Sequence, residues 1–167
     1  MTTILGIDLG ERRIGVAIAE LDGFAARPLT TLRRSGAIEG DAAAIQALID
    51  TYEIDEIVVG LPLESAGREG VQAGLTRAWA EALAPLLEDA TPITWQDERL
   101  SSHVAEQRLG PMKRGRSGGP PSRTQRDAYR ARVDREAASI ILQDALDERR
   151  SGDAARPTPS TTMETRT

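Results

Sequence analysis

Three acidic side chains, far apart in the sequence, have the residue type and the setting for chemistry on a phosphodiester bond. Asp8 lies inside the apolar run 4–9, Glu98 follows a short apolar segment, and Asp134 opens a helical pattern. A buried carboxylate is costly unless a partner compensates for it, so Asp8 calls for one. Converging carboxylates repel one another without a cation, and Mg²⁺ or Mn²⁺ prefers oxygen ligands. Two such ions can activate a water and stabilise the leaving oxygen of a phosphodiester.

Each of these acids also has a structural alternative. Asp8 could pair with a buried arginine or lie at a frayed strand end. Asp97 competes with Glu98, since both are loop acids by position. Asp134 could cap a helix, because carboxylates favour helix N-termini, although a cap can also be a ligand. The only histidine, His103, lies within a predicted helix, and we expect no catalytic role for it.

The spacing of apolar residues predicts the elements that must position these acids. Strands are expected over about 3–9, 14–19, up to 32, 55–62 and 91–95, and helices over about 38–52, 69–88, 101–109 and 133–148. Short turns make the first three strands an antiparallel meander, and the following strands are joined through helices. The order predicts an α/β protein with a mixed five-stranded sheet and helices on both faces, which is the ribonuclease H-like layout. Asp8 and Glu98 would then share the edge at the strands' carboxyl ends, and a helix N-terminus would add Asp134.

Length and composition predict a single domain. The chain has 167 residues, so we expect one ribonuclease H-like domain over 1–149, a mobile basic loop over 110–126 and a disordered tail over 150–167. The chain contains no cysteine, which excludes disulfides, thiolate metal sites and cysteine nucleophiles. We see no secretory signal and no membrane-spanning run, and therefore expect a cytoplasmic protein without a membrane partner.

The basic residues are concentrated in one district of an acidic chain. The net charge is -5, which argues against a general nucleic-acid binder. Yet seven cations lie between Arg108 and Arg135, opposed only by Asp127 and Asp134; they are Lys113, Arg114, Arg116, Arg123, Arg126, Arg130 and Arg132. This district lies between two of the candidate acids, so Lys113, Arg114 and Arg116 could fold over the same site and hold a phosphate backbone. The alternative is a solvated loop.

Four segments, in order and at consistent spacing, match the motifs of a known family. They read GIDLGERRIGVAI, DEIVVGLPL, DERLS and VDREAASIIL. With them the chain resembles, from about residue 3 to 148, the YqgF/RuvX family of pre-16S rRNA nucleases, also described as Holliday junction resolvases. The resemblance implies metal-binding, catalytic acids at Asp8, Glu98 and Asp134, a basic turn at Arg12, and a Gly-Leu-Pro loop at 60–62. It also implies magnesium-dependent hydrolysis of phosphodiester bonds during maturation of the 5′ end of 16S rRNA.

Two arginines beside these motifs complete the predicted substrate contacts. Arg99 either orients the acids through an ion pair or contacts phosphate. Arg132 stands where the family commonly has a lysine; it keeps the charge but changes its geometry. We therefore include Arg99 and Arg132, with Arg12, among the residues expected to bind substrate.

Three functions of different classes compete. The first is an endonuclease, a hydrolase acting on pre-16S rRNA or, alternatively, a resolvase acting on four-way DNA junctions. The second is an actin-like ATPase, whose first phosphate loop resembles residues 7–10, but such proteins need two of these domains. The third is a non-catalytic ribosome-assembly factor that binds RNA through residues 108–135. We favour the first; no sequence feature decides between a monomer and a homodimer.

Overall fold

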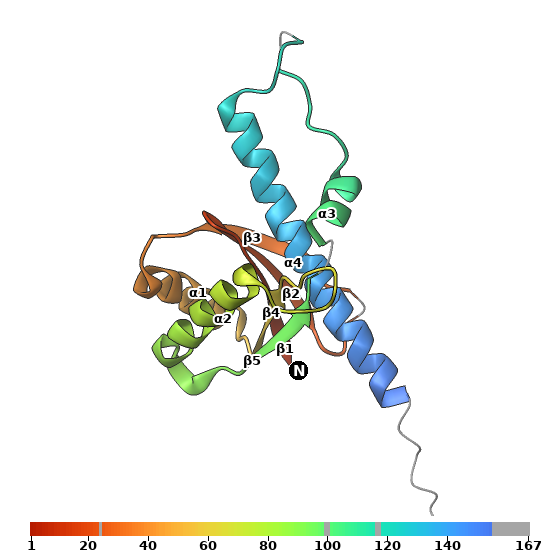
Figure 1. Cartoon of the computed structure of the whole chain (residues 1–167). Coiled ribbons are helices and arrows are strands. Elements are labelled where there is room, and N and C mark those ends of the chain that lie inside the picture. The colour runs from red at the N-terminus through yellow and green to blue at the C-terminus, as the bar shows by residue number, and fades with distance from the viewer. Residues whose placement is uncertain (24, 99–100, 116–117, 155–167) are drawn as a thin grey trace, which may run out of the picture.

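A mixed five-stranded sheet forms the centre of the protein (Figure 1). The computed structural model describes residues 1–23, 25–98, 101–115 and 118–154. The strands are β1 (Thr3–Leu9), β2 (Arg13–Glu20), β3 (Arg27–Arg33), β4 (Glu56–Leu61) and β5 (Ile93–Asp97), in the spatial order β3-β2-β1-β4-β5. The first three pair antiparallel, whereas β4 pairs parallel with β1 and with β5. The predicted meander with two added parallel strands is confirmed.

Helices cover both faces of the sheet, as predicted. α1 (Ile38–Tyr52) and α2 (Val71–Leu83) lie on one face, and α4 (Arg123–Ala154) crosses the other (Figure 1). Successive residues of a strand point to opposite faces, so Leu5 and Ile7 join the core under α1 and α2, whereas Ile4 packs with α4. The same alternation turns Asp8 towards α4.

The helix predicted over 69–88 is shorter in the structure. It ends at Leu83 and is followed by two single-turn 3₁₀ helices, Ala84–Leu86 and Glu88–Ala90. Pro85 lies in the first of them, and a proline within a helix lacks the N–H needed to continue it. None of the helices in the described ranges is long and apolar enough to cross a membrane.

α3 (Ser101–Leu109) and the first half of α4 project together beyond the sheet, and we call this part the arm (Figure 1). α4 begins at Arg123, so the predictions of a loop up to 126 and of a helix start near 133 were wrong. The reason is a reciprocal cap: the Ser122 N–H donates to Gln125 Oε1 (2.8 Å), and the Gln125 N–H donates to Ser122 Oγ (3.2 Å). This pairing satisfies N–H groups that a helix start otherwise leaves free.

The far end of α4 also extends past the predicted boundary. We expected a disordered tail from residue 150, but the helix continues to Ala154. Arg150 donates to the carbonyl of Gly23, and the Ser151 hydroxyl donates to the Asp147 carbonyl at 2.9 Å. The Arg150 contact ties the last turns to the segment between β2 and β3, and the Ser151 contact lies within the helix. Residues 155–167, the remainder of the predicted tail, lie outside the described residues.

Candidate active site

Asp8 and Glu98 meet at the carboxyl ends of β1 and β5, the two strands that flank β4. Asp8 lies at the end of β1 on the face covered by α4, and only 8% of it is exposed. Glu98 follows β5 directly, and its N–H donates to the Leu61 carbonyl at 3.1 Å, which fixes it beside the end of β4. A Cβ atom on Gly60 would lie 2.6 Å from Glu98 Oε2. The missing side chain of Gly60 therefore leaves the space in which Glu98 reaches across β4 towards β1.

The two carboxyl groups share a hydrogen bond, which requires a proton on one of them. Burial raises the pKa of Asp8 to about 6; the hydrogen bond with Glu98 opposes this rise, and the Asp134 charge adds to it. Burial, together with the charge of Asp8, raises the pKa of Glu98 to about 9. At neutral pH the pair thus holds a proton in place of a second negative charge.

Asp134 lies beside this pair but is held by another residue. The backbone of α4 at Asp134 lies close to Gly15 of β2, because a Cβ atom added to Gly15 would be only 2.0 Å from the Asp134 carbonyl oxygen. Gly15 is the residue that pairs with Asp8 between β1 and β2. The Asp134 carboxylate accepts a 2.5 Å hydrogen bond from Arg13 Nε. Among the described residues, no three acidic, histidine or cysteine side chains are arranged to hold a metal ion. The structure thus brings all three predicted acids to one end of the sheet, and we call these three residues the carboxylate cluster. Asp8 and Glu98 are in contact, and Asp134 is ion-paired with Arg13.

The carboxylate cluster fits a divalent cation in its chemistry. Its donors are carboxylate oxygens, which Mg²⁺ and Mn²⁺ prefer, and the proton shared by Asp8 and Glu98 marks a site that attracts positive charge. The hydroxyl of Ser101 is buried and has no hydrogen-bond partner within the described ranges. Its backbone N–H donates to the Glu98 carbonyl at 3.2 Å, so this free polar group starts α3 next to the cluster. Unsatisfied buried polar groups are rare and often mark functional sites.

The structural alternatives have clear positions. Asp97 lines a different hollow with Asp144 and Glu148, although its charge helps to raise the pKa of Glu98. His103 is exposed on α3 and contacts Gln107 of the same helix at 3.1 Å. The geometry therefore distinguishes Glu98 from Asp97 as the neighbour of Asp8.

The predicted substrate-binding residues are scattered. Arg12 is exposed on the turn between β1 and β2 and lines a hollow near the cluster. Lys113 and Arg114 are exposed in the segment joining α3 to α4, which Figure 1 shows at the outer end of the arm. Arg132 is exposed on α4. Arg99 and Arg116 lie outside the described residues.

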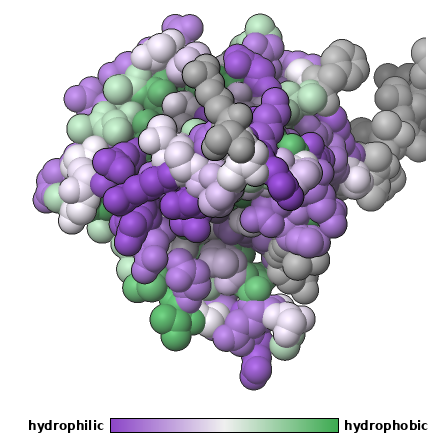
Figure 2. All heavy atoms as spheres, turned by 90° about the horizontal axis from the view of Figure 1, so that it is seen from above, coloured by the Kyte–Doolittle hydropathy of each residue, from purple (hydrophilic) through white to green (hydrophobic). Residues whose placement is uncertain are grey.

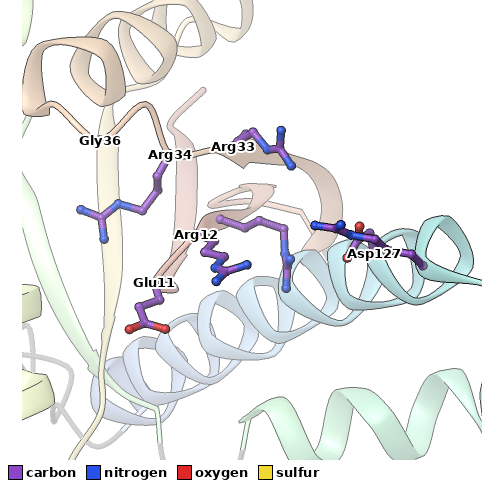
Figure 3. A pocket seen from close by; sticks show the side chains of 8 residues that line it. Glu11, Arg12, Arg33, Arg34, Gly36 and Asp127 are labelled. Carbon is purple, nitrogen blue, oxygen red and sulfur yellow. The ribbon is translucent and has the colours of Figure 1, made fainter.

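A basic cleft adjoins the cluster, and of its arginines the sequence had indicated only Arg12 as a substrate contact and Arg123 and Arg130 as part of the basic district. It consists of two hollows of about 480 and 340 Å³ that have Arg12 and Arg13 in common, and the smaller one reaches Asp134. Six arginines line the cleft: Arg12, Arg13, Arg33, Arg34, Arg123 and Arg130. Figure 3 shows Arg12 on the β1–β2 turn, Arg33 and Arg34 at the end of β3, and Asp127 on α4. The available sequence signal was the pair of arginine doublets at 12–13 and 33–34.

Metal-free protein should lose stability as the pH rises from about 5 to about 9. Asp8 and Glu98 have folded-state pKa values of about 6 and about 9, raised from 3.8 and 4.5, so the folded state binds more protons in this range. A raised carboxyl pKa makes the free energy of unfolding fall as the pH rises through this range. Urea unfolding in EDTA at several pH values measures the effect.

Glu98→Gln supplies the matching comparison for this pH dependence. It removes the group with the larger shift and should flatten most of the profile. The exposed Glu106→Gln on α3 removes a carboxylate outside the cluster and should leave the profile unchanged. A profile of the same steepness in Glu98→Gln as in the unaltered chain would contradict the assignment.

Sequence comparison relates the chain to proteins of several bacteria. A family model described as "RuvX: Holliday junction resolvase" matches residues 2–148. A Chloroflexus aggregans protein named "Putative pre-16S rRNA nuclease" is 42% identical over 149 residues, covering 89% of this chain and 96% of that protein. An Anaeromyxobacter dehalogenans protein of the same name is 45% identical over 145 residues, covering 87% and 96%. The chain is thus similar to them along nearly their whole length.

Comparison with solved structures supports the fold. The structure of T. thermophilus RuvC in complex with a Holliday junction substrate matches with a TM-score of 0.52 and 15% identity, covering 90% of this chain and 97% of that one. At this identity the likeness concerns the fold alone. The predicted ribonuclease H-like fold is confirmed.

Proposed function

The chain belongs to the RuvX family, and we propose that it is a metal-dependent endonuclease that hydrolyses phosphodiester bonds at the carboxylate cluster. The observation that carries this proposal is the contact between Asp8 and Glu98 at the carboxyl edge of the sheet. Two buried carboxyl groups in contact have a structural cost, which a catalytic site with a bound cation would explain.

Asp8, Glu98 and Asp134 would hold the cation, Mg²⁺ or Mn²⁺. A divalent ion there supplies an activated water and neutralises charge that develops on the phosphate and its leaving oxygen. Asp8 and Glu98 can exchange their shared proton for this charge. Arg13 donates to Asp134 and sets the direction of its carboxylate, so we assign it a positioning role. Ser101 offers a hydroxyl beside Glu98 for a hydrogen bond to water or phosphate.

The substrate we propose is pre-16S rRNA, in which the enzyme would process the 5′ end. The names of the two bacterial relatives support this choice. Such a substrate would place the protein in the cytoplasm. The description of the family model favours a second candidate, a four-way DNA junction. A symmetric junction would require two active sites related by two-fold symmetry, and hence a homodimer, whereas rRNA processing can be carried out by a monomer.

Cleavage assays with both substrates test the proposal. Purified protein is incubated with precursor rRNA and with a four-way junction, each with added MgCl₂ or with EDTA. We expect cleavage of the precursor RNA that depends on the metal and is abolished in Asp8→Asn. Cleavage confined to the junction would select the resolvase. Binding of RNA without any cleavage, unchanged when all three acids are replaced, would select the RNA-binding assembly factor instead.

A further inference from the structure

We propose that the basic cleft binds the phosphate backbone of a single strand of RNA or DNA and leads it to the carboxylate cluster. The inference rests on the proposed function and deepens it, because it assigns the path of the substrate to the cleft between the β1–β2 turn, the end of β3 and the start of α4.

The sheet brings like charges together at the cleft. Arg13 lies directly opposite Arg33 in the pairing of β2 with β3, and the Arg34 N–H donates to the Arg12 carbonyl at 2.9 Å. Directly opposed like charges destabilise a sheet. Local conflicts of this kind are expected where a site is built for a ligand, here an anion that would lie between the guanidinium groups.

Most of these arginines are available for a ligand. In the part of the chain that the structure describes, four of the six have no ion pair: Arg12, Arg33, Arg123 and Arg130. The acids beside them are Glu11, Asp127 and Asp134, so positive charge prevails in a chain whose net charge is -5. Guanidinium groups bind phosphate in a bidentate, charge-assisted manner, which suits a phosphodiester backbone.

Arg34 is held in place by a buried acid. Asp41 of α1 is only 3% exposed and accepts from Arg34 Nε (3.3 Å), from the Ser35 N–H (3.1 Å) and from Trp79 Nε1 (3.1 Å). Arg34 also donates to the Gly10 carbonyl at 3.2 Å, in the turn that follows β1. This network connects the core to the cleft wall, so the wall is preorganised before substrate binds.

The lining of the cleft favours the backbone over the bases. The lining residues that the structure describes are arginines, acids and glycines, and none of these provides an aromatic ring for the stacking of bases. Figure 2 shows the molecule from above, with hydrophilic residues predominating over much of the surface in view. A hollow of about 480 Å³ has the size of a small-ligand site, which one or a few nucleotides of a single strand could occupy.

The cleft also leads to the proposed site of hydrolysis. The larger hollow extends to Arg33 and Arg123, and the smaller one ends at Asp134 of the carboxylate cluster. A strand that enters between β3 and α4 would pass Arg12 and Arg130 before reaching this cluster. Successive phosphates along one strand thus have successive cationic partners.

Binding of labelled single strands tests the cleft. The variant is Arg33→Gln/Arg123→Gln, which removes two exposed charges at the outer end of the larger hollow. The matched control is Arg27→Gln/Arg150→Gln, which removes two exposed charges at the opposite end of β3 and of α4. Fluorescence anisotropy in EDTA follows RNA and DNA oligonucleotides of the same sequence over a range of salt concentrations, and circular dichroism checks that each variant is folded.

We expect the cleft variant to bind RNA and DNA about 10-fold more weakly than the control, with a salt slope smaller by about 1.4, as for two lost phosphate contacts. Equal affinity of the two variants would overturn the cleft, and so would a loss confined to RNA. Cleavage assays separate this result from the proposed function. If cleavage depends on Asp8 but the cleft variant binds as well as the control, only the proposal for the cleft fails. If the cleft variant binds more weakly but the unaltered chain cleaves nothing, only the proposal of a nuclease fails.

Discussion

Asp8→Asn should lower the rate of phosphodiester cleavage at saturating substrate by at least about 1,000-fold. The substitution keeps the size of the side chain but removes one negative oxygen from the carboxylate cluster. Asp8 is the central member of this cluster, since it contacts Glu98 and the charge of Asp134 helps to raise its pKa. A cation held there would lose several kcal/mol of electrostatic stabilisation. Single-turnover cleavage of precursor RNA in Mg²⁺ measures the change.

The fold should survive this substitution. Asp8 is 8% exposed and burial raises its pKa to about 6, so the folded state destabilises its charged form relative to the unfolded chain. An asparagine carries no charge, and the free energy of unfolding in EDTA should therefore be unchanged or higher. Thermal unfolding of both proteins under identical conditions is the measurement.

Asp97→Asn is the informative control for the cleavage experiment. Asp97 is adjacent to Glu98 in sequence but lines another hollow, so its substitution should reduce cleavage by less than about 10-fold. If Asp8→Asn retained full magnesium-dependent activity in a preparation free of other nucleases, the cluster would not be the active site. The same conclusion would follow if Asp97→Asn had the larger effect.

Gly15→Ala should destabilise the protein by about 3 kcal/mol and lower its Tm by about 10 °C. The added Cβ atom would lie 2.0 Å from the carbonyl oxygen and 2.3 Å from the carbonyl carbon of Asp134. Both are backbone atoms of α4, so the helix itself must move away from β2. That movement would disturb the packing of α4 on the sheet and shift Asp134 away from Asp8. Differential scanning calorimetry measures the stability, and cleavage should fall as well.

Gly74→Ala is the matched control for the close approach of α4. Gly74 is exposed in α2, with no atom within 4 Å of its would-be Cβ atom. Alanine there restricts the unfolded chain and favours the helix, so stability should rise by about 0.5–1 kcal/mol. If Gly15→Ala had as little effect as Gly74→Ala, α4 would not lie against β2 as the structure has it.

The layout of the sheet was predictable because its signals are local. The apolar runs around Ile7 and Val16 alternate with tight turns, and short turns force neighbouring strands to pair antiparallel. The positions of Asp8 and Glu98 at strand ends then followed from the rule that strand ends share an edge. The order of the elements alone was therefore enough to predict that these two acids lie at the same edge of the sheet.

The start of α4 was not predictable from apolar spacing, because its first turns carry almost no apolar residues. Residues 123–128 read RTQRDA, and their helix depends on the cap formed by Ser122 and Gln125. Tyr129 then packs with α3 and donates to the Gly110 carbonyl at 2.9 Å. A capping box is visible in the sequence, but the contacts that extend the helix depend on the neighbouring element.

The amino-acid sequence alone was sufficient to predict the ribonuclease H-like fold and, through its four family motifs, a nuclease. The binding of a cation by the three acids stays a prediction. Tertiary structure decided how these groups are used. It gave Glu98 its place over Gly60, paired Asp134 with Arg13, and joined the doublets at 12–13 and 33–34 into one cleft. The reason is physical: residue types and strand order are encoded locally, whereas burial, pairing and distance between charges depend on how strands far apart in the chain are packed.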